Sequence, residues 1–269
     1  MSNSTILPQR GIYPKAENAV RIMTFNLLYK GNGEHAMENR TGIAAQTIAE
    51  YLPDSLGVQE ATPAWMEALT HQLPEYSFVG VGREDGKALG EYTAVFYLKA
   101  KYKMIDTGNF WLSDTPQIPS KSWGSNLNRV CTWAVLENLL TGERYAHINT
   151  HLDNRGEPEC KKGIDMLLEK AAGFQMPVVC TGDFNLKENS GFYKYLMNGV
   201  LLDTKFASPD TMNHPTSHGF DLSAHGDDII DYILVNKRLN PLVYRVVTEG
   251  INGKPVSDHY PVYSDLSFN

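Results

Sequence analysis

The chain has 269 residues, of which 42% are hydrophobic and 20% are charged, so it can bury a core and is not disordered, collagen-like or coiled-coil. Its 24 lysines and arginines and 31 aspartates and glutamates give a formal charge of −7. This charge excludes a histone-like protein that binds DNA through cationic contacts alone. It does not exclude a nuclease whose site is acidic because it holds a metal ion.

Hydrophobic periodicity and turn signals divide the chain into a polar tail over residues 1–19 and one domain over residues 20–269. The elements predicted in the first half are a strand at 20–26, a helix at 37–52, a short apolar run at 55–60, a helix at 63–73, and strands at 76–81, 91–98 and 102–112. A polar loop at 113–128 is followed by a hairpin of strands at 130–139 and 144–150. The elements predicted after the hairpin are a helix at 157–172, a strand at 177–181, a short helix at 190–196, a polar loop at 204–227, and strands at 229–235, 242–247 and 261–266. Strands outnumber helices, and helices occur in both halves. This pattern favours two β-sheets packed face to face with helices outside over a doubly wound Rossmann sheet.

The cysteines and the apolar segments indicate the compartment. The chain has an odd number of cysteines and no C-x-x-C pair, so neither a disulfide framework nor a cysteine zinc site is expected. The three are Cys131, Cys160 and Cys180. The N-terminus has no apolar core of a signal peptide, and no apolar run approaches the ~20 residues of a membrane helix. We therefore expect a cytoplasmic location, no membrane insertion and no obligate protein partner.

Polar side chains recur where the apolar strands end. A lone aspartate after a strand usually caps a turn, but eight such residues at several strand ends are harder to explain by turns. Strand ends on one rim of a sheet converge, so we expect a single site there. The eight residues are Asn26, Glu60, His151, Asp183, Asn185, Asp231, Asp258 and His259.

Three of these residues suit a hard divalent cation. Mg²⁺ takes oxygen ligands, commonly one or two carboxylates with water and substrate phosphate, and Mn²⁺ accepts similar ligands. The carboxylates of Glu60 and Asp258 and the amide of Asn26 supply such a set. A metal site that serves phosphoester cleavage is therefore expected at this rim.

The order of these motifs resembles that of the endonuclease/exonuclease/phosphatase superfamily. The resemblance runs from about residue 20 to residue 266, and it implies a four-layered αββα sandwich of two mainly antiparallel sheets that hydrolyses phosphoester bonds. It also implies that Glu60 is the principal metal ligand. The motifs are Asn26 in TFN, Glu60 in VQE, Asn149-Thr150-His151-Leu152-Asp153, Gly182-Asp183-Phe184-Asn185, Asp231-Tyr232-Ile233 and Ser257-Asp258-His259.

The resemblance implies roles for the other residues of the site. Asp183 would activate or orient the attacking water, and Asn185 would bind phosphate. His259, held by Asp231, and His151 would stabilise the phosphoryl group or protonate the leaving oxygen. Which of these residues acts as acid and which as base stays open, because members of the superfamily are interpreted differently.

The segment after Asn185 indicates a branch of this superfamily. Ser190, Tyr193 and Leu196 follow in an S-x-x-Y-x-x-L pattern that is similar to deadenylases, nocturnin and related bacterial proteins. Abasic-site endonucleases usually have an acid where this chain has Leu28. The prediction is a Mg²⁺-dependent nuclease or phosphodiesterase that acts on RNA or single-stranded ends of RNA or DNA. The alternatives are hydrolysis of a small phosphorylated metabolite or lipid headgroup, and an inactive binding protein on the same scaffold.

Three further residues are candidates for substrate binding, each with an ordinary alternative. Trp123 lies in a polar loop, where its ring could stack on a base or pack locally. Arg129 precedes a strand and could bind phosphate or form an ion pair. Glu91 is predicted to begin a strand; the family resemblance implies that it supports the metal ligand, and the alternative is a strand start exposed to solvent.

Overall fold

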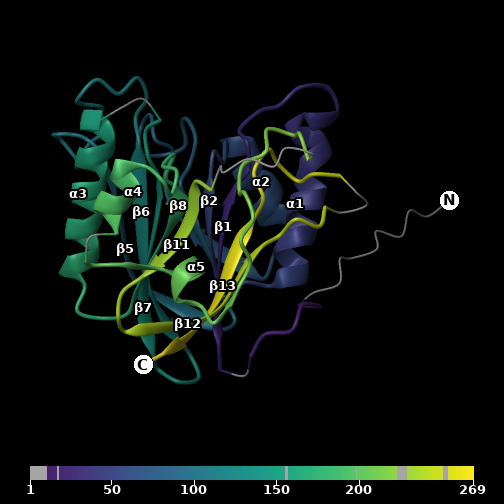
Figure 1. The fold of residues 1–269 in the computed structure, drawn as a ribbon. Coiled ribbons are helices and arrows are strands. Elements are labelled where there is room, and N and C mark those ends of the chain that lie inside the picture. The colour runs from purple at the N-terminus through teal and green to yellow at the C-terminus, as the bar shows by residue number, and fades with distance from the viewer. Residues whose placement is uncertain (1–10, 17, 155–156, 198, 223–228, 251–253) are drawn as a thin grey trace.

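The chain folds as two β-sheets packed face to face, with helices on the outer face of each sheet (Figure 1). One pair of helices, α1 and α2, lies on one side, and α3 and α4 lie on the other. The predicted four-layered αββα sandwich is therefore confirmed. The computed structural model describes residues 11–16, 18–154, 157–197, 199–222, 229–250 and 254–269.

The first sheet has seven strands in the order β10-β12-β13-β1-β2-β4-β3. Their bounds are β1 Val20–Asn26, β2 Ser55–Gln59, β3 Tyr76–Val79, β4 Val95–Leu98, β10 Asp210–Thr211, β12 Leu239–Val246 and β13 Val262–Phe268. Helices α1 (Met37–Tyr51) and α2 (Pro63–Gln72) cover its outer face, where Trp65 is fully buried. Strands β1 and β2 are parallel, so both end at the same rim.

The second sheet has six strands in the order β5-β6-β7-β8-β11-β9. Their bounds are β5 Tyr102–Trp111, β6 Val130–Asn138, β7 Arg144–His151, β8 Val178–Asp183, β9 Leu202–Asp203 and β11 Asp231–Val235. Helices α3 (Glu157–Gly173) and α4 (Gly191–Leu196) cover its outer face. Strands β6 and β7 form the predicted hairpin, and most neighbouring strands in both sheets are antiparallel, as predicted.

A chain of buried polar side chains crosses between the two sheets. His147 Nδ1 lies 2.8 Å from Ser55 Oγ, and its Nε2 lies 2.8 Å from Thr181 Oγ1. Asn149 Oδ1 accepts hydrogen bonds from Thr181 Oγ1 at 3.0 Å and from Gln59 Nε2 at 2.7 Å. Burial lowers the pKa of His147 to about 3, so the ring is neutral at physiological pH. These hydrogen bonds fix the position of one sheet against the other.

The predicted polar loop over residues 204–227 was wrong in its first part. A short helix, α5 (Thr204–Ala207), begins after Asp203, whose side chain accepts a hydrogen bond from the Lys205 N–H. Strand β10 follows and pairs in parallel with β12. Elements this short leave little periodic signal in a sequence. Residues 223–227 of that loop lie outside the described part of the chain.

Several element boundaries also differ from the prediction. Strand β4 begins at Val95 instead of residue 91, because the backbone at Glu91 hydrogen-bonds to Arg83 in a loop. Strand β12 begins before Pro241, where the register shifts and the missing N–H is tolerated. A turn of 3₁₀ helix, η1 (Gly33–His35), precedes α1.

Part of the predicted tail packs on the domain. The guanidinium of Arg21 donates to the carbonyls of Tyr13 and Pro14, and the Gly11 N–H donates to the Ala49 carbonyl. Residues 1–10 and 17 of the tail lie outside the described part, and the boundary at residue 20 stays a prediction. Within the described residues, every helix is too short or too polar to cross a membrane.

Candidate active site

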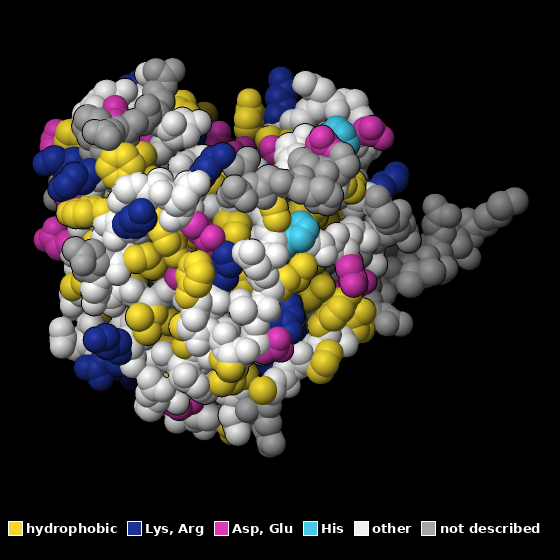
Figure 2. Space-filling model, viewed as in Figure 1, with side chains coloured by type: hydrophobic (Ala, Val, Ile, Leu, Met, Phe, Trp, Pro, Cys, Tyr) yellow, Lys and Arg dark blue, Asp and Glu magenta, His cyan; other side chains and the backbone are white. Residues whose placement is uncertain are grey.

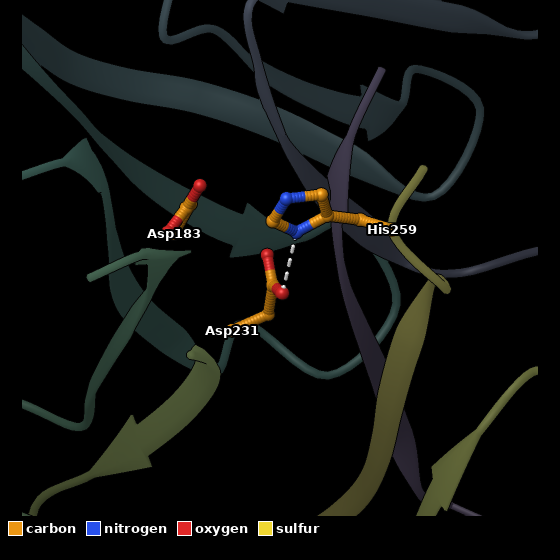
Figure 3. Close-up of side chains that lie close together, drawn as sticks. All are labelled: Asp183, Asp231 and His259. Atoms are coloured by element: carbon orange, nitrogen blue, oxygen red, sulfur yellow. Dashed lines mark hydrogen bonds and ion pairs between the residues drawn. The ribbon is translucent and has the colours of Figure 1, made fainter. Parts of the chain in front are cut away.

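Three neighbouring strands of the second sheet place three of the predicted site residues in one row. In the register of the sheet, Asp183 at the end of β8 is paired with His151 at the end of β7 and with Asp231 at the start of β11. Strand β11 runs antiparallel to β8, so its first residue reaches the rim where β8 ends. All three side chains are almost fully buried. Figure 3 shows Asp183 and Asp231 facing the ring of His259, which lies in the segment before β13 of the first sheet.

Asn26 joins the two sheets across the rim. Its Nδ2 donates to Glu60 Oε1 at 3.2 Å and to Asp183 Oδ2 at 2.9 Å, so the two carboxylates share one amide nitrogen. Its Oδ1 accepts from the Leu28 N–H, and Glu60 Oε2 accepts from the Tyr29 N–H. The structure therefore brings Asn26 and Glu60, from the first half of the chain, together with Asp183 from the second half.

His259 and Asp231 form a buried ion pair. His259 Nδ1 lies 2.8 Å from Asp231 Oδ2, and only 8% of the histidine is exposed. Burial disfavours the imidazolium, but the charge and hydrogen bond of Asp231, aided by Asp183 and Asp258, outweigh it and raise the pKa of His259 to about 10. The imidazole is thus positively charged at neutral pH and donates from Nδ1 to Asp231.

For Asp183 and His151, in contrast, burial prevails and favours the neutral form of each side chain. Burial, followed by the charge of Asp231, raises the pKa of Asp183 to about 7, although His259 opposes this. Burial, with the positive charges of Arg129, Arg83 and His259, holds the pKa of His151 well below its ordinary value. His151 Nε2 lies 3.4 Å from Asp183 Oδ2. A neutral imidazole therefore sits beside a carboxyl group that can exchange a proton near neutral pH.

Two groups of side chains could be considered for a metal ion. Potential ligand atoms of Asp183, Asp231 and His259 all lie within 4.8 Å of one another. The ion pair uses His259 Nδ1 and keeps the ring protonated, so this group suits proton handling better than metal binding. Half-buried Glu60 and Asp258 instead offer carboxylate oxygens, the donors that Mg²⁺ prefers.

A cationic flank borders the row on the side of His151. Arg129 and Arg83 are both buried, and their charges act on His151. Arg83 donates to Glu91 Oε2 at 2.6 Å, while Arg129 Nε lies 3.8 Å from Asp153 Oδ2. Burial raises the pKa of Glu91, which Arg83 opposes, and the charge of Glu60 also acts on it. The predicted residues Glu91 and Arg129 therefore lie beside the row.

Asn185 and Trp123 occupy different positions. Asn185 adopts the left-handed backbone conformation (φ 51°), its N–H donates to Asp183 Oδ1, and its Nδ2 donates to the Leu152 carbonyl. Its amide is thus anchored next to the row. Trp123 donates to Asp114 Oδ1 at 2.8 Å, and Lys162 lies over its ring, so its substrate-binding role stays a prediction.

The sequence reasoning missed two residues that the structure places here. Arg83 lies in the glycine-rich segment after β3, and its only local signal is the acid eight residues later, Glu91. Thr216 Oγ1 accepts from the N–H groups of Ile230 and Asp231 and so fixes the start of β11. No sequence pattern distinguishes that threonine from others in the loop.

Comparisons with known proteins agree with this geometry. Rat nocturnin is 24% identical over 294 residues, which cover 93% of this chain and 66% of nocturnin, so the chain spans about two thirds of that relative. An endonuclease/exonuclease/phosphatase family protein from Bacteroides thetaiotaomicron has a solved structure that is 29% identical, with a TM-score of 0.88 over 93% of this chain and 95% of that chain. The mannosyl-6-phosphatase Bt3783 of Bacteroides thetaiotaomicron is also 29% identical, with a TM-score of 0.87 over 93% of this chain and all of that chain. The sequence profile of the Endonuclease/Exonuclease/phosphatase family matches residues 23–259, and the chain belongs to this family.

Proposed function

We propose that the protein is a divalent-metal-dependent phosphoester hydrolase whose reaction takes place at the row of His151, Asp183 and Asp231. Family membership supports phosphoester hydrolysis. The observation that carries the proposal is the double hydrogen bond of Asn26, which links the oxygen-rich side at Glu60 to the proton-handling side at Asp183. Burial of the charged groups at Asp183, Asp231 and His259 costs free energy of desolvation, which favours a catalytic role over the inactive binding scaffold.

Glu60 and Asp258, with Asn26, would hold Mg²⁺ or Mn²⁺. The chemistry of the donors fits a hard dication, because Glu60 and Asp258 offer half-buried carboxylates and Asn26 offers an amide oxygen with a second lone pair beside its bond to Leu28. When bound, such an ion neutralises charge on the phosphoryl oxygens and lowers the cost of forming a nucleophile from water. Asn26 keeps the ligand side and the reacting side at a fixed separation.

The side chains of the site have separate roles: one transfers a proton, and others stabilise charge on the phosphoryl group. Asp183, with a pKa near 7, accepts a proton from the attacking water or orients that water. The His259 imidazolium, fixed by Asp231, stabilises the negative charge that develops on the phosphoryl oxygens. Neutral His151 can donate a hydrogen bond to a phosphoryl or leaving oxygen, and anchored Asn185 borders the same space.

A compact phosphoester is the substrate class that the charges support best. The cationic side chains of the site, Arg83 and Arg129, gather at one point beside His151, where they can neutralise a single phosphate. On the face drawn in Figure 2, lysine and arginine side chains of the described residues are scattered and form no continuous stripe for a nucleic-acid backbone. The similar protein Bt3783, named a mannosyl-6-phosphatase, also favours a small phosphorylated substrate.

Nuclease activity on RNA or single-stranded ends is the second candidate. It is favoured by the similarity to nocturnin and by the half-buried Trp123, whose indole could stack on a base beside the cationic flank. Ser125, two residues later, donates to Asp153 Oδ2, and Arg129 lies near the same oxygen. The loop that carries Trp123 is thus tied to the edge of the site.

The predicted location and partners follow from the same features. The three cysteines are free and buried, which supports a reducing, cytoplasmic compartment. The phosphoester substrate is the one partner that the site itself requires. The absence of an obligate protein partner stays a prediction.

The test is a metal-dependent hydrolysis panel with sugar phosphates, nucleotide monophosphates, oligoadenylate, single-stranded DNA and sphingomyelin. We expect Mg²⁺- or Mn²⁺-dependent release of phosphate from a small phosphomonoester, with E60Q lowering the rate at least a hundredfold. Shortening of oligoadenylate without phosphate release from small substrates would favour the nuclease instead. Equal activity of E60Q and the unmodified protein would contradict the metal assignment.

A further inference from the structure

A buried arginine outside the catalytic row uses its whole donor capacity on backbone carbonyls. Arg40 of α1 is 2% exposed. Its guanidinium makes five hydrogen bonds of 2.5–3.2 Å, and every acceptor is a main-chain oxygen: those of His35, Leu27, Val256, Leu28 and Lys30. Five is the full number of N–H donors that a guanidinium carries. Among the described residues, no carboxylate forms an ion pair with it.

The five carbonyls belong to three segments that surround the proposed metal side. Three of them lie in the loop over residues 27–30, which directly follows Asn26 at the end of β1. One belongs to η1, and one belongs to Val256, two residues before Asp258. Arg40 therefore ties the segment after one candidate ligand to the segment before another. This network connects positions more than 200 residues apart in the chain.

The loop that Arg40 holds is in a strained conformation. Leu28 has a φ of 54°, in the left-handed region that non-glycine residues rarely adopt, and so has Glu60 at 56°. In this conformation the Tyr29 N–H donates to Glu60 Oε2, and the Leu28 N–H donates to Asn26 Oδ1. Such backbone states persist only where the surroundings over-determine them. The bonds from Arg40, with one from Trp65 Nε1 to the Leu28 carbonyl, supply that constraint.

The charge of Arg40 acts on the same two carboxylates. Burial lowers the pKa of the guanidinium, and the charges of Asp258 and Glu60, in that order, act against burial. The guanidinium carbon lies over the ring of Trp65, 5.2 Å from the ring centre, where a cation–π interaction also stabilises the charge. A fixed positive charge close to Glu60 and Asp258 reduces their mutual repulsion before a cation binds.

We propose that Arg40 is the positioning residue of the metal side, clamping the 27–30 loop and the segment before Asp258 so that Asn26, Glu60 and Asp258 stand ready for a divalent cation. The inference rests on the proposed function. It assigns to Arg40 no contact with substrate or metal. Its effect is a higher affinity for the cation, obtained because the ligands need not be ordered when the cation arrives.

Arg21 of β1 provides a matched control for Arg40. It is 1% exposed and also donates to backbone carbonyls, those of Tyr13, Tyr51 and Pro14, and it pairs with Asp265. It lies at the start of β1, whereas the metal side lies beyond the end of that strand. Replacing either arginine removes a buried, fully bonded guanidinium, so general destabilisation should be comparable. Only Arg40 is placed to change the affinity for a cation.

The experiment measures binding of Mn²⁺ to the full chain by electron paramagnetic resonance, in the unmodified protein and in R40K, R21K, W65F and E60Q. An ammonium can satisfy at most three acceptors, so we expect R40K to raise the Kd for Mn²⁺ at least tenfold. R21K should leave the Kd unchanged within a factor of two. In steady-state assays the metal concentration for half-maximal rate should rise in R40K, while kcat at saturating metal stays within threefold.

Trp65→Phe keeps the proposal testable if R40K does not fold. It removes one hydrogen bond to the Leu28 carbonyl and keeps an aromatic ring, and the Kd for Mn²⁺ should rise at least threefold. An unchanged Kd in folded R40K, or in W65F where R40K is unfolded, would overturn the proposal, as would an equal rise in R21K. If Mn²⁺ binding by the unmodified protein is insensitive to E60Q, the proposed metal site itself is wrong, and both inferences fall together.

Discussion

Replacing Asp231 by asparagine should change the charge state of His259 at neutral pH. The substitution keeps the size of the side chain and removes the negative charge that lies 2.8 Å from Nδ1. Burial of the imidazole remains, and burial alone lowers the pKa of a histidine. We therefore expect the pKa of His259 to fall from about 10 to below 7 in D231N.

The contribution of His259 to the free energy of unfolding follows from the pKa of its imidazole in the folded protein. The difference between about 10 and the ordinary value of about 6.5 corresponds to about 5 kcal/mol of preferential interaction with the charged ring. Because this pKa is raised, the stabilisation is complete below pH 6.5 and is lost as the pH rises through 10. The free energy of unfolding should fall over that interval in the unmodified protein. In D231N the fall should largely disappear.

The assay is a titration of the histidine ε1 protons by NMR, with the His259 signal assigned through His259→Gln. Asp203→Asn is the control, since Asp203 is a buried acid of the same sheet that accepts from the Tyr193 hydroxyl. D203N should leave the His259 titration unchanged. A ring that titrates near 6.5 in the unmodified protein, or that stays charged above pH 9 in D231N, would refute the reasoning. Urea unfolding at pH 7 and pH 10 checks the linked stability change.

Three further outcomes are expected. Because the pKa of Asp183 is raised to about 7, kcat/KM should rise with pH towards 7 and level off above it, and this inflection should disappear in D183N, whose activity falls at least a hundredfold. Replacing Arg83 by methionine should raise KM for a phosphomonoester at least tenfold, with a smaller change in kcat, in initial-rate assays. A Cβ at Gly57 would lie 2.2 Å from Thr181 Oγ1, so G57A should lose roughly 1–3 kcal/mol in urea unfolding, whereas G173A, with open space at its Cβ, should be close to neutral.

The strand-end residues could be predicted because their positions depend on local pattern. Val20–Asn26 alternates and ends at a polar residue, and Asp183 follows a buried strand in the same way. Once strands are known to end at one rim, the meeting of their last residues requires only sheet topology. Asn26, Glu60 and Asp183 were expected together on these grounds, and the shared amide nitrogen joins them.

The supporting residues could not be predicted, because their roles depend on tertiary contacts alone. Arg40 occupies an ordinary position in an amphipathic helix, and its five acceptors come from segments with no sequence relation to one another. Arg83 lies in a segment whose glycines resemble a phosphate loop but lack its spacing. Helix α5 was not predicted either, because a helix of four residues leaves no hydrophobic periodicity in the sequence.

The site depends on how the two sheets are held against each other. The proposed metal side, with Glu60, comes from the first sheet, and Asp183 comes from the second. Apolar burial between the sheets is non-directional and would tolerate small sliding movements. The hydrogen bonds of His147 and Asn149 are directional, and they reach Gln59, which immediately precedes Glu60. The polar chain inside the sandwich therefore sets the separation across which Asn26 bridges the two carboxylates, and a purely apolar interior would leave that separation poorly defined.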